Sequence, residues 1–306
     1  MTFKRFFSTC AALTLLIVSS VVGLNVYMND YGLFGNVKGA SIPIYANERT
    51  SKYLMSFNYI PANFEGLLIG SSVSNSLNTQ KLSPHRVYNG SLEGGNYSEL
   101  RLIAENVFRK GNSKFLIVCL HPYTSQTHGR RSSFMRPHEY WESLGSLAMI
   151  ELYRRKLLVH FGKRKAICND YGAYEKDFSR KNRASKELIS ARAAAILKEG
   201  KKITIDAIAY QELADLLGQA RALGIPIFAY YHPYPYDIFE MIKESYQDYR
   251  DRMDKLFSNT DVVWDFNTET YFLFRKDYDN YSDEGHLSLK GADFVLKEIK
   301  NRLNGR

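Results

Sequence analysis

The chain has 306 residues, of which 45% are hydrophobic and 24% charged, and its formal net charge is +9. These fractions are those of an ordinary globular protein, and the length suits one large α/β domain, or two small ones, with a core that needs neither metal nor disulfide. The cysteines have no metal-binding spacing and the basic charge is not accompanied by a nucleic-acid-binding motif. The sequence therefore argues against zinc-dependent and nucleic-acid-binding classes.

The first thirty residues differ from the rest. Lys4 and Arg5 precede a run without charges from Phe6 to Met28, which exceeds the roughly 20 residues that span a bilayer. Basic residues before the run and Asp30 after it favour an amino end in the cytoplasm. We expect residues 1–30 to be a single-pass anchor in the cytoplasmic (inner) membrane, with the following chain on the periplasmic or extracytoplasmic side. A cleaved signal peptide is the alternative, and it also exports the domain.

Residues 31–64 are expected to form a linker and a short lead-in helix, and residues 65–306 one domain. Apolar runs predict five strands, at Gly66–Ile69, Arg86–Tyr88, Lys114–Leu120, Ile225–Tyr231 and Asp261–Phe266. Amphipathic stretches predict helices at Tyr97–Arg109, Ile208–Leu223, Ile238–Phe257 and Lys290–Leu303. This alternation predicts a three-layer, flavodoxin-like α/β fold, with a parallel sheet of about five strands and helices on both faces.

Residues 121–205 interrupt the alternation and predict a helical insertion after the third strand, which could act as a cap or lid. Its helices are expected at Glu139–Phe161 and Arg183–Glu199. Between His128 and Lys202 the chain has 18 Lys and Arg and 8 Asp and Glu, so this window accounts for the whole net charge. It is either a solvated insertion or a surface for anionic lipid head groups or an acidic glycan.

The three cysteines are Cys10 in the apolar amino-terminal run, Cys119 in the third strand and Cys168 in the insertion. In an oxidising compartment Cys119 and Cys168 could form a disulfide. Cys119 could equally serve as a small buried hydrophobe. The sequence leaves both possibilities open.

Two short motifs lie at the carboxyl ends of predicted strands. The first strand ends in Gly70-Ser71-Ser72, and Asp283-x-x-His286 precedes the last helix. An Asp can accept the Nδ1 proton of a His, whose Nε2 can then take a proton from a serine hydroxyl. Ligands of open parallel sheets bind outside the carboxyl ends of the strands, so the two motifs could meet at this edge. Separately, Ser72 could be a helix N-cap and Asp283 could cap the last helix.

With these motifs the chain resembles the SGNH, or GDSL, hydrolases over roughly residues 65–300. The resemblance implies Ser72 as nucleophile, with His286 and Asp283 as its catalytic partners. The sequence YNGSLEGG is similar to the family's second block and implies Gly94 as a backbone oxyanion donor. The Gly-Ser-Ser form resembles relatives that handle acyl groups on bacterial envelope polymers, such as alginate O-acetylation and D-alanyl transfer proteins.

The third block of that family, Gly-x-Asn-Asp after the third strand, is absent. The sequence LHPYTS stands there, with His121 and Pro122. The missing Asn is an oxyanion donor in the family, and loss of one such donor typically costs about 10²–10³ in rate. Another group must substitute for it, or the activity is low or absent.

Further candidates could line the same edge. His121 and His232 each follow an apolar strand, and each could donate to an oxyanion or simply be held by the turn at its following Pro. Asn75 could face the site from the first helical turn or lie on the helix surface. A metal bound by the histidines lacks any motif spacing. The sequence therefore predicts neither a metal nor a cofactor.

Together these features predict an exported, membrane-anchored serine acylesterase or O-acyltransferase acting on an envelope or secreted polysaccharide. The expected partners are an acylated or acceptor glycan, the membrane and, by analogy with the resembled relatives, a membrane-bound O-acyltransferase, but no nucleic acid. The alternative is a non-catalytic, SGNH-shaped component of a polysaccharide assembly or export complex. The missing third block and the basic insertion favour this alternative.

Overall fold

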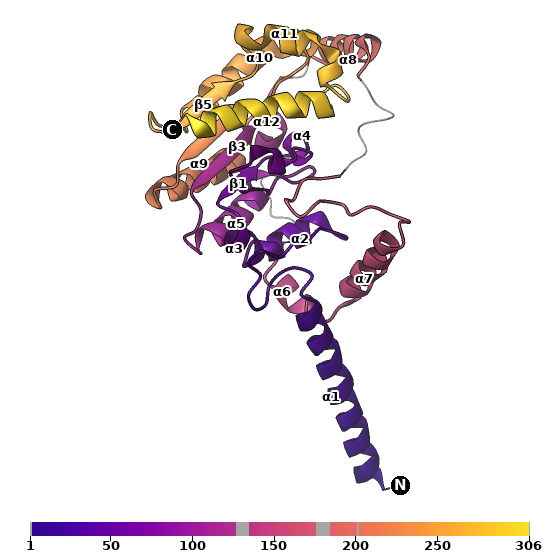
Figure 1. Cartoon of the computed structure of the whole chain (residues 1–306). Coiled ribbons are helices and arrows are strands. Elements are labelled where there is room, and N and C mark those ends of the chain that lie inside the picture. The colour runs from indigo at the N-terminus through magenta and orange to yellow at the C-terminus, as the bar shows by residue number, and fades with distance from the viewer. Residues whose placement is uncertain (1, 127–134, 176–183, 201, 306) are drawn as a thin grey trace.

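The protein is described by a computed structural model that covers residues 2–126, 135–175, 184–200 and 202–305 (Figure 1). At its centre is a five-stranded sheet in which all neighbouring strands are parallel, in the order β2-β1-β3-β4-β5. The strands are β1 (Gly66–Ile69), β2 (Val87–Asn89), β3 (Phe115–Leu120), β4 (Ile227–Tyr231) and β5 (Val262–Asp265). This order is that of the flavodoxin-like sheet and confirms the predicted fold class.

The three central strands are buried along their whole length, as their uninterrupted apolar sequences predict. In the register of the sheet, Leu68 lies opposite Ile117 and Ile117 opposite Phe228. The carboxyl ends of β1, β3 and β4 therefore lie side by side, which places the residues that follow them at a common edge.

Helices surround the sheet (Figure 1). On one face α5 (Tyr97–Phe108) packs against α9 (Ala207–Ala222), and both α2 (Glu48–Met55) and α3 (Tyr59–Asn63) contact α5. On the other face α12 (Leu289–Asn304) packs against the 3₁₀ turn η1 (Thr79–Leu82). The remaining elements beside the sheet are α10 (Tyr236–Asp254), α11 (Phe272–Lys276), η3 (Glu269–Tyr271) and η4 (Tyr278–Asn280).

Local signals in the sequence explain where the principal helices begin. Asn96 and Glu99 form a capping box at the start of α5, each side chain accepting the other residue's backbone N–H. The Ser288 hydroxyl accepts the Gly291 N–H at the start of α12. These caps fix the entry points of two helices whose preceding loops, residues 90–95 and 282–287, carry candidate site residues.

The helical insertion between β3 and α9 contains η2 (Pro122–Ser125), α6 (His138–Glu142), α7 (Leu147–His160) and α8 (Lys186–Glu199). The prediction of one helix over Glu139–Phe161 is wrong, because the helix is interrupted between the end of α6 and the start of α7. At the break Gly145 lies against Val21, and the Leu144 carbonyl accepts a hydrogen bond from another segment. The predicted start of the second helix, Arg183, lies outside the described residues.

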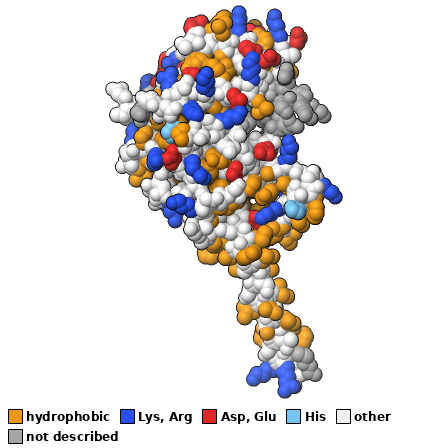
Figure 2. All heavy atoms as spheres, in the orientation of Figure 1, with side chains coloured by type: hydrophobic (Ala, Val, Ile, Leu, Met, Phe, Trp, Pro, Cys, Tyr) orange, Lys and Arg blue, Asp and Glu red, His pale blue; other side chains and the backbone are white. Residues whose placement is uncertain are grey.

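The helix α1 (Phe3–Met28) extends away from the domain, and its most apolar window has a mean hydropathy of 2.1 with no residue buried (Figures 1 and 2). It is long and apolar enough to cross a membrane, a property that a signal sequence shares. The segment after it is part of the domain rather than a free tether. Its buried side chains include Tyr31, Met55, Tyr59 and Ile60.

Cys119 and Cys168 are both buried free thiols. Cys119 lies within β3, and burial raises the pKa of its thiol to about 12. The backbone of Cys168 forms isolated bridges with Ile44 and Tyr174, and its thiol donates to Glu48 Oε1 at 3.8 Å. The structure therefore contains no Cys119–Cys168 disulfide, and both residues serve as small core side chains.

Candidate active site

Ser72, His286 and Asp283 form a continuous hydrogen-bonded relay. His286 Nε2 lies 3.1 Å from Ser72 Oγ, and His286 Nδ1 lies 2.9 Å and 3.0 Å from the two carboxylate oxygens of Asp283. The serine and the histidine are 214 positions apart in the chain. All three residues are partly exposed, so the relay is reachable from solvent. This arrangement can deprotonate the serine hydroxyl while the carboxylate holds the imidazole.

The end of β1 explains the small residues before Ser72. A side chain at Gly70 would overlap Ser74 Oγ and would lie 2.7 Å from Cys119 Cβ, so this position requires glycine. Ser71 follows in extended conformation, and its hydroxyl is buried without a hydrogen-bond partner among the described residues. Ser72 is then the first residue of the short helix α4 (Ser72–Asn75).

Asp283 organises the turn that carries the histidine. Its Oδ1 accepts hydrogen bonds from the backbone N–H groups of Gly285 and His286, at 2.8 Å and 2.7 Å. Burial alone would raise the pKa of Asp283, but the His286 imidazole and these two N–H groups outweigh it and hold the pKa below its usual 3.8. The carboxylate is therefore kept ionised, which suits the role of orienting an imidazole.

His232, at the end of β4, supports this turn from the sheet. Its Nε2 lies 2.9 Å from the carbonyl oxygen of Gly285, so Nε2–H donates to that carbonyl. Its Nδ1 is buried and has no partner among the described residues. Burial, together with the proximity of the His121 and His286 imidazoles, which disfavours adding a positive charge here, lowers the pKa of His232 well below 6.5. His232 is thus a neutral side chain that positions the turn.

His121 lies beside His232 with the ring centroids 5.7 Å apart. Its Nδ1 accepts the backbone N–H of Tyr123, so its Nε2–H is left to donate to the Tyr234 hydroxyl at 2.9 Å. Burial, and to a smaller extent the proximity of the His286 imidazole, lowers the pKa of His121 to about 3. The structure therefore brings both predicted histidines to the site edge, but it engages both ring nitrogens of His121 in hydrogen bonds.

Gly94 lies in a turn that is held against the end of β1. The Leu92 N–H donates to the Gly70 carbonyl, and the Gly95 N–H donates to the Leu92 carbonyl. Gly94 has φ +59°, a conformation that favours glycine. Its own N–H takes part in none of the hydrogen bonds between described residues. Gly94 thus fits the predicted role of a backbone donor, which stays a prediction.

Asn75, the last residue of α4, is buried. Its Oδ1 accepts a hydrogen bond from Lys52 Nζ at 3.1 Å, and its carbonyl accepts from Asn89 Nδ2. The Asn75 Nδ2 makes no hydrogen bond to another described residue. A role of this amide as oxyanion donor therefore stays a prediction, whereas its oxygen belongs to the support of α4.

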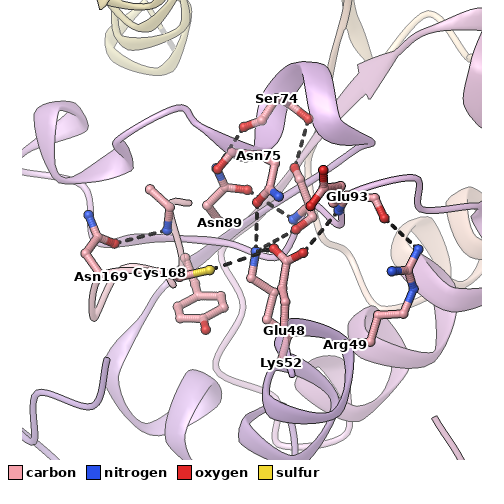
Figure 3. A network of polar contacts seen from close by, with 12 residues as sticks. Glu48, Arg49, Lys52, Ser74, Asn75, Asn89, Glu93, Cys168 and Asn169 are labelled. Carbon is pink, nitrogen blue, oxygen red and sulfur yellow. Dashed lines mark hydrogen bonds and ion pairs between the residues drawn. The ribbon is translucent and has the colours of Figure 1, made fainter. Parts of the chain in front are cut away.

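Lys52 is the centre of this support and was not predicted from the sequence. Its side chain is fully buried, and Nζ donates to Glu48 at 2.9 Å, to Asn75 Oδ1 and to the Ser91 carbonyl (Figure 3). One ammonium group thus joins α2, α4 and the loop before Gly94. A Glu and a Lys four positions apart normally predict an exposed helix pair, so the sequence carried no signal for burial.

The same loop has two further attachments to α2. Glu48 Oε2 accepts the Glu93 N–H at 3.1 Å, and Arg49 Nη2 donates to the Glu93 carbonyl at 2.6 Å (Figure 3). Arg49 in turn pairs with Glu99 in the first turn of α5. These contacts hold Ser91 and Glu93 against α2, which Lys52 also links to α4, so the start of the Gly94 turn is fixed relative to the helix that carries Ser72.

A cavity of about 630 Å³ lies on the other side of this loop. Its lining comes mainly from α2, α6 and α7 and includes Arg49, Glu93 and Glu139, but none of Ser72, Asp283 and His286. The relay itself lies at the open edge of the sheet. In the described part of the chain, no group of three or more His, Cys, Asp or Glu side chains is arranged to hold a metal ion.

The fold and the relay define a parallel α/β protein with a Ser-His-Asp arrangement at the carboxyl edge of its sheet. No protein-family model matches the chain. No curated protein matches it either. Among solved structures, it is similar to a chain described as a "putative platelet activating factor" from Streptococcus pneumonia, with 13% identity and a TM-score of 0.42, over 84% of this chain and 91% of the other.

Proposed function

We propose that this protein is a membrane-anchored, SGNH-like serine acylesterase or O-acyltransferase. The observation that carries the proposal is the relay from Asp283 through His286 to Ser72, with Nε2 3.1 Å from the serine oxygen. An activated serine hydroxyl is the nucleophile of acyl transfer through a covalent acyl-enzyme. The ionised state of Asp283 supports the same role, because only the carboxylate can stabilise the imidazolium that forms.

In the proposed acylation, His286 Nε2 takes the proton of Ser72 Oγ as the oxygen attacks an ester carbonyl. The backbone N–H groups of Ser72 and Gly94 hold the oxyanion of the tetrahedral intermediate. The intermediate collapses, the ester C–O bond breaks, and His286 returns its proton to the departing alcohol. The acyl group is then bonded to Ser72 Oγ.

In the second half, His286 deprotonates the acceptor, which attacks the acyl-serine and releases Ser72 with its proton. Water as acceptor gives hydrolysis, and a sugar hydroxyl gives O-acyl transfer. We propose an envelope or secreted polysaccharide as the glycan, with the domain held by α1 on the extracytoplasmic side of the cytoplasmic membrane. A membrane-bound O-acyltransferase that supplies the acyl group is the proposed protein partner.

One observation favours a second candidate, a non-catalytic component of a polysaccharide assembly or export complex. The family's third block would place an asparagine donor after β3, where this chain has His121. Both ring nitrogens of His121 already make hydrogen bonds, to the Tyr123 N–H and to the Tyr234 hydroxyl. Unless Asn75 or another group supplies the missing donor, catalysis would be weak.

The test is covalent labelling of the full-length chain in detergent with a fluorophosphonate, with the modified residue located by mass spectrometry. We expect an adduct on Ser72 that is absent in Ser72→Ala and strongly reduced in His286→Ala. Ser76→Ala is the matched control, because Ser76 is the C-cap of the same short helix and makes no contact with His286 among the described hydrogen bonds. A folded wild type without any adduct would refute the catalytic proposal and favour the second candidate.

A further inference from the structure

Helices α6 and α7 expose large apolar side chains to solvent. The exposed fractions of these side chains range from 57% to 83%. We call this set the α6–α7 apolar face; it consists of Trp141, Leu147, Ile150, Leu157 and Phe161. A monomeric water-soluble protein rarely exposes a contiguous apolar patch unless it is an interaction surface.

The spacing along α7 shows that this exposure is a property of one helix side. Leu147, Ile150 and Leu157 follow one another at three and seven positions, and Phe161 follows four positions later, so they share a stripe. Met149 and Leu152 are buried, on the side that packs against the domain. The helix is thus apolar on two sides, and the domain covers only one of them.

The segment that carries the apolar face is attached to the end of α1. Asn25 is buried near the end of α1 and donates to the Leu144 carbonyl at 2.8 Å, while the Tyr153 hydroxyl donates to Asn25 Oδ1 at 2.5 Å. Lys156 forms an ion pair with Asp30 just beyond α1. The segment between α6 and α7 is therefore fixed at the level at which α1 joins the domain, and Figure 2 shows hydrophobic side chains gathered around this junction.

Three basic residues follow shortly after the last residue of the α6–α7 apolar face. Lys163, Arg164 and Lys165 follow α7 directly and are all exposed. Arg154, on the exposed side of α7, is paired with Glu151. A row of exposed cations beside an exposed apolar stripe is the pattern of a helix that lies at a membrane surface, where apolar side chains enter the acyl boundary and cations meet anionic lipids.

We propose that the α6–α7 apolar face lies in the head-group region of the membrane that α1 crosses, with Lys163, Arg164 and Lys165 on anionic lipid head groups. The inference rests on α1 being a membrane span and does not depend on the esterase chemistry. A lipid surface is favoured over a protein partner because the segment that carries the face is joined to α1 at Asn25 and is followed by three cations. It would make a second attachment of the domain to the bilayer.

The protein offers a native reporter for this proposal, because it has two tryptophans. Trp141 is on the apolar face and 69% exposed, whereas Trp264 is 7% exposed in β5. The experiment reconstitutes the full-length chain into vesicles of phosphatidylcholine brominated in its acyl chains, with and without phosphatidylglycerol. Bromine quenches only a tryptophan that reaches the acyl region.

We expect part of the wild-type emission to be quenched and this part to vanish in Trp141→Phe. Lys163→Gln, Arg164→Gln and Lys165→Gln together should reduce the quenching in vesicles with phosphatidylglycerol to its level in phosphatidylcholine alone. As matched control, Leu273→Trp in the Trp141→Phe background places an exposed tryptophan on α11, at the end of the molecule far from α1, and should not be quenched (Figure 1).

Equal quenching of wild type and Trp141→Phe would overturn the proposal, since Trp141 would then not contact lipid. So would emission of Trp141 that shifts with protein concentration without bromolipid quenching, which would indicate a second copy on this face. Circular dichroism and the unfolding transition of each variant confirm that the compared chains are folded.

Discussion

The imidazole of His232 donates a hydrogen bond to the carbonyl oxygen of Gly285, the residue directly before His286, at 2.9 Å. This bond connects the end of a central strand with the turn that carries the proposed general base. It requires a protonated Nε2 and leaves the buried Nδ1 without a partner. The position of His286 relative to Ser72 therefore depends on a second histidine that does not touch the serine.

The first prediction concerns this support. His232→Ala should lower kcat for an activated ester such as 4-nitrophenyl acetate by about 10²-fold, because a displacement of roughly 1 Å at a reacting group can cost that much. The KM should change little. His232→Gln, which can still donate from a similar position, should recover part of the loss.

His85→Ala is the matched control for His232→Ala. His85 bridges Glu65 and Asn304 near the amino end of β1, away from the relay. We expect wild-type turnover for this variant. If His232→Ala and His85→Ala have the same kcat, the turn does not need the support of β4.

The second prediction concerns the carboxylate. Asp283→Asn keeps the size of the side chain but removes the charge that stabilises a protonated His286. We expect kcat to fall by about 10³–10⁴, the loss typical of such a change in serine hydrolases. Steady-state kinetics with the same ester test this. Asp293→Asn, an exposed carboxylate on α12 that pairs with Lys81, should leave kcat unchanged.

The third prediction concerns the buried ammonium of Lys52. Lys52→Met leaves Glu48 buried without its cation and should reduce the free energy of unfolding by about 3–5 kcal/mol. Lys81→Met removes an ion pair whose side chains are 49% and 52% exposed, and should cost at most about 1 kcal/mol. Chemical denaturation of both variants makes the comparison, and equal midpoints would contradict a structural role for the buried pair.

The fourth prediction concerns Gly94. Gly94→Ala and Gly224→Ala both force alanine into left-handed backbone, with φ +59° and +68°, at a cost of about 1–2 kcal/mol each. A Cβ at Gly94 would also lie 3.4 Å from the Tyr123 hydroxyl, whereas Gly224 has open space. Thermal denaturation should show similar destabilisation, but ester hydrolysis should fall only in Gly94→Ala. Equal activities would remove Gly94 from the site.

The fifth prediction concerns pH. The pKa of His121 is lowered to about 3 and that of His232 lies well below 6.5, so the unfolded chain binds more protons than the folded one below about pH 6.5. Stability should therefore fall on acidification, with up to about 1.4 kcal/mol per pH unit from each histidine.

Urea denaturation between about pH 7.5 and pH 4.5 measures this slope. His121→Asn should reduce it, because one buried group that must stay neutral has been removed. A wild-type stability that does not fall across this range would contradict the assignment of both histidines as neutral in the folded protein.

The sheet and the relay were predictable from the sequence for definite reasons. Each strand is a short apolar run, and the parallel order places the ends of those runs at one edge. Gly70-Ser71-Ser72 and Asp283-x-x-His286 each follow or precede such an element, so their meeting follows from topology. The boundaries differ by a residue or two, as between the predicted Ile225–Tyr231 and β4.

The support of the site was not predictable, because its partners come from separate segments with no shared pattern. The sequence predicts Lys52 to be an exposed residue on a helix surface. It is buried only because α2 packs against the loop before Gly94. The interruption between α6 and α7 depends in part on Asn25, which lies more than a hundred residues earlier. The Asn25 side-chain amide donates a hydrogen bond to the Leu144 carbonyl. Whether Cys119 and Cys168 form a disulfide likewise depends on the distance between the two thiols in the folded chain. The separation of the two cysteines along the sequence does not determine this distance.

The hydrogen bond between Ser72 and His286 can form only late in the synthesis and folding of the chain. Ser72 lies in the first quarter of the sequence, and the proposed base, His286, is synthesised only with the last turn before α12. Until β5 completes the edge of the sheet and that turn docks, Ser72 is an ordinary hydroxyl. A nascent or truncated chain that lacks this turn would thus have no serine-based acyl-transfer activity. Such activity, if measured, would require the completely folded chain.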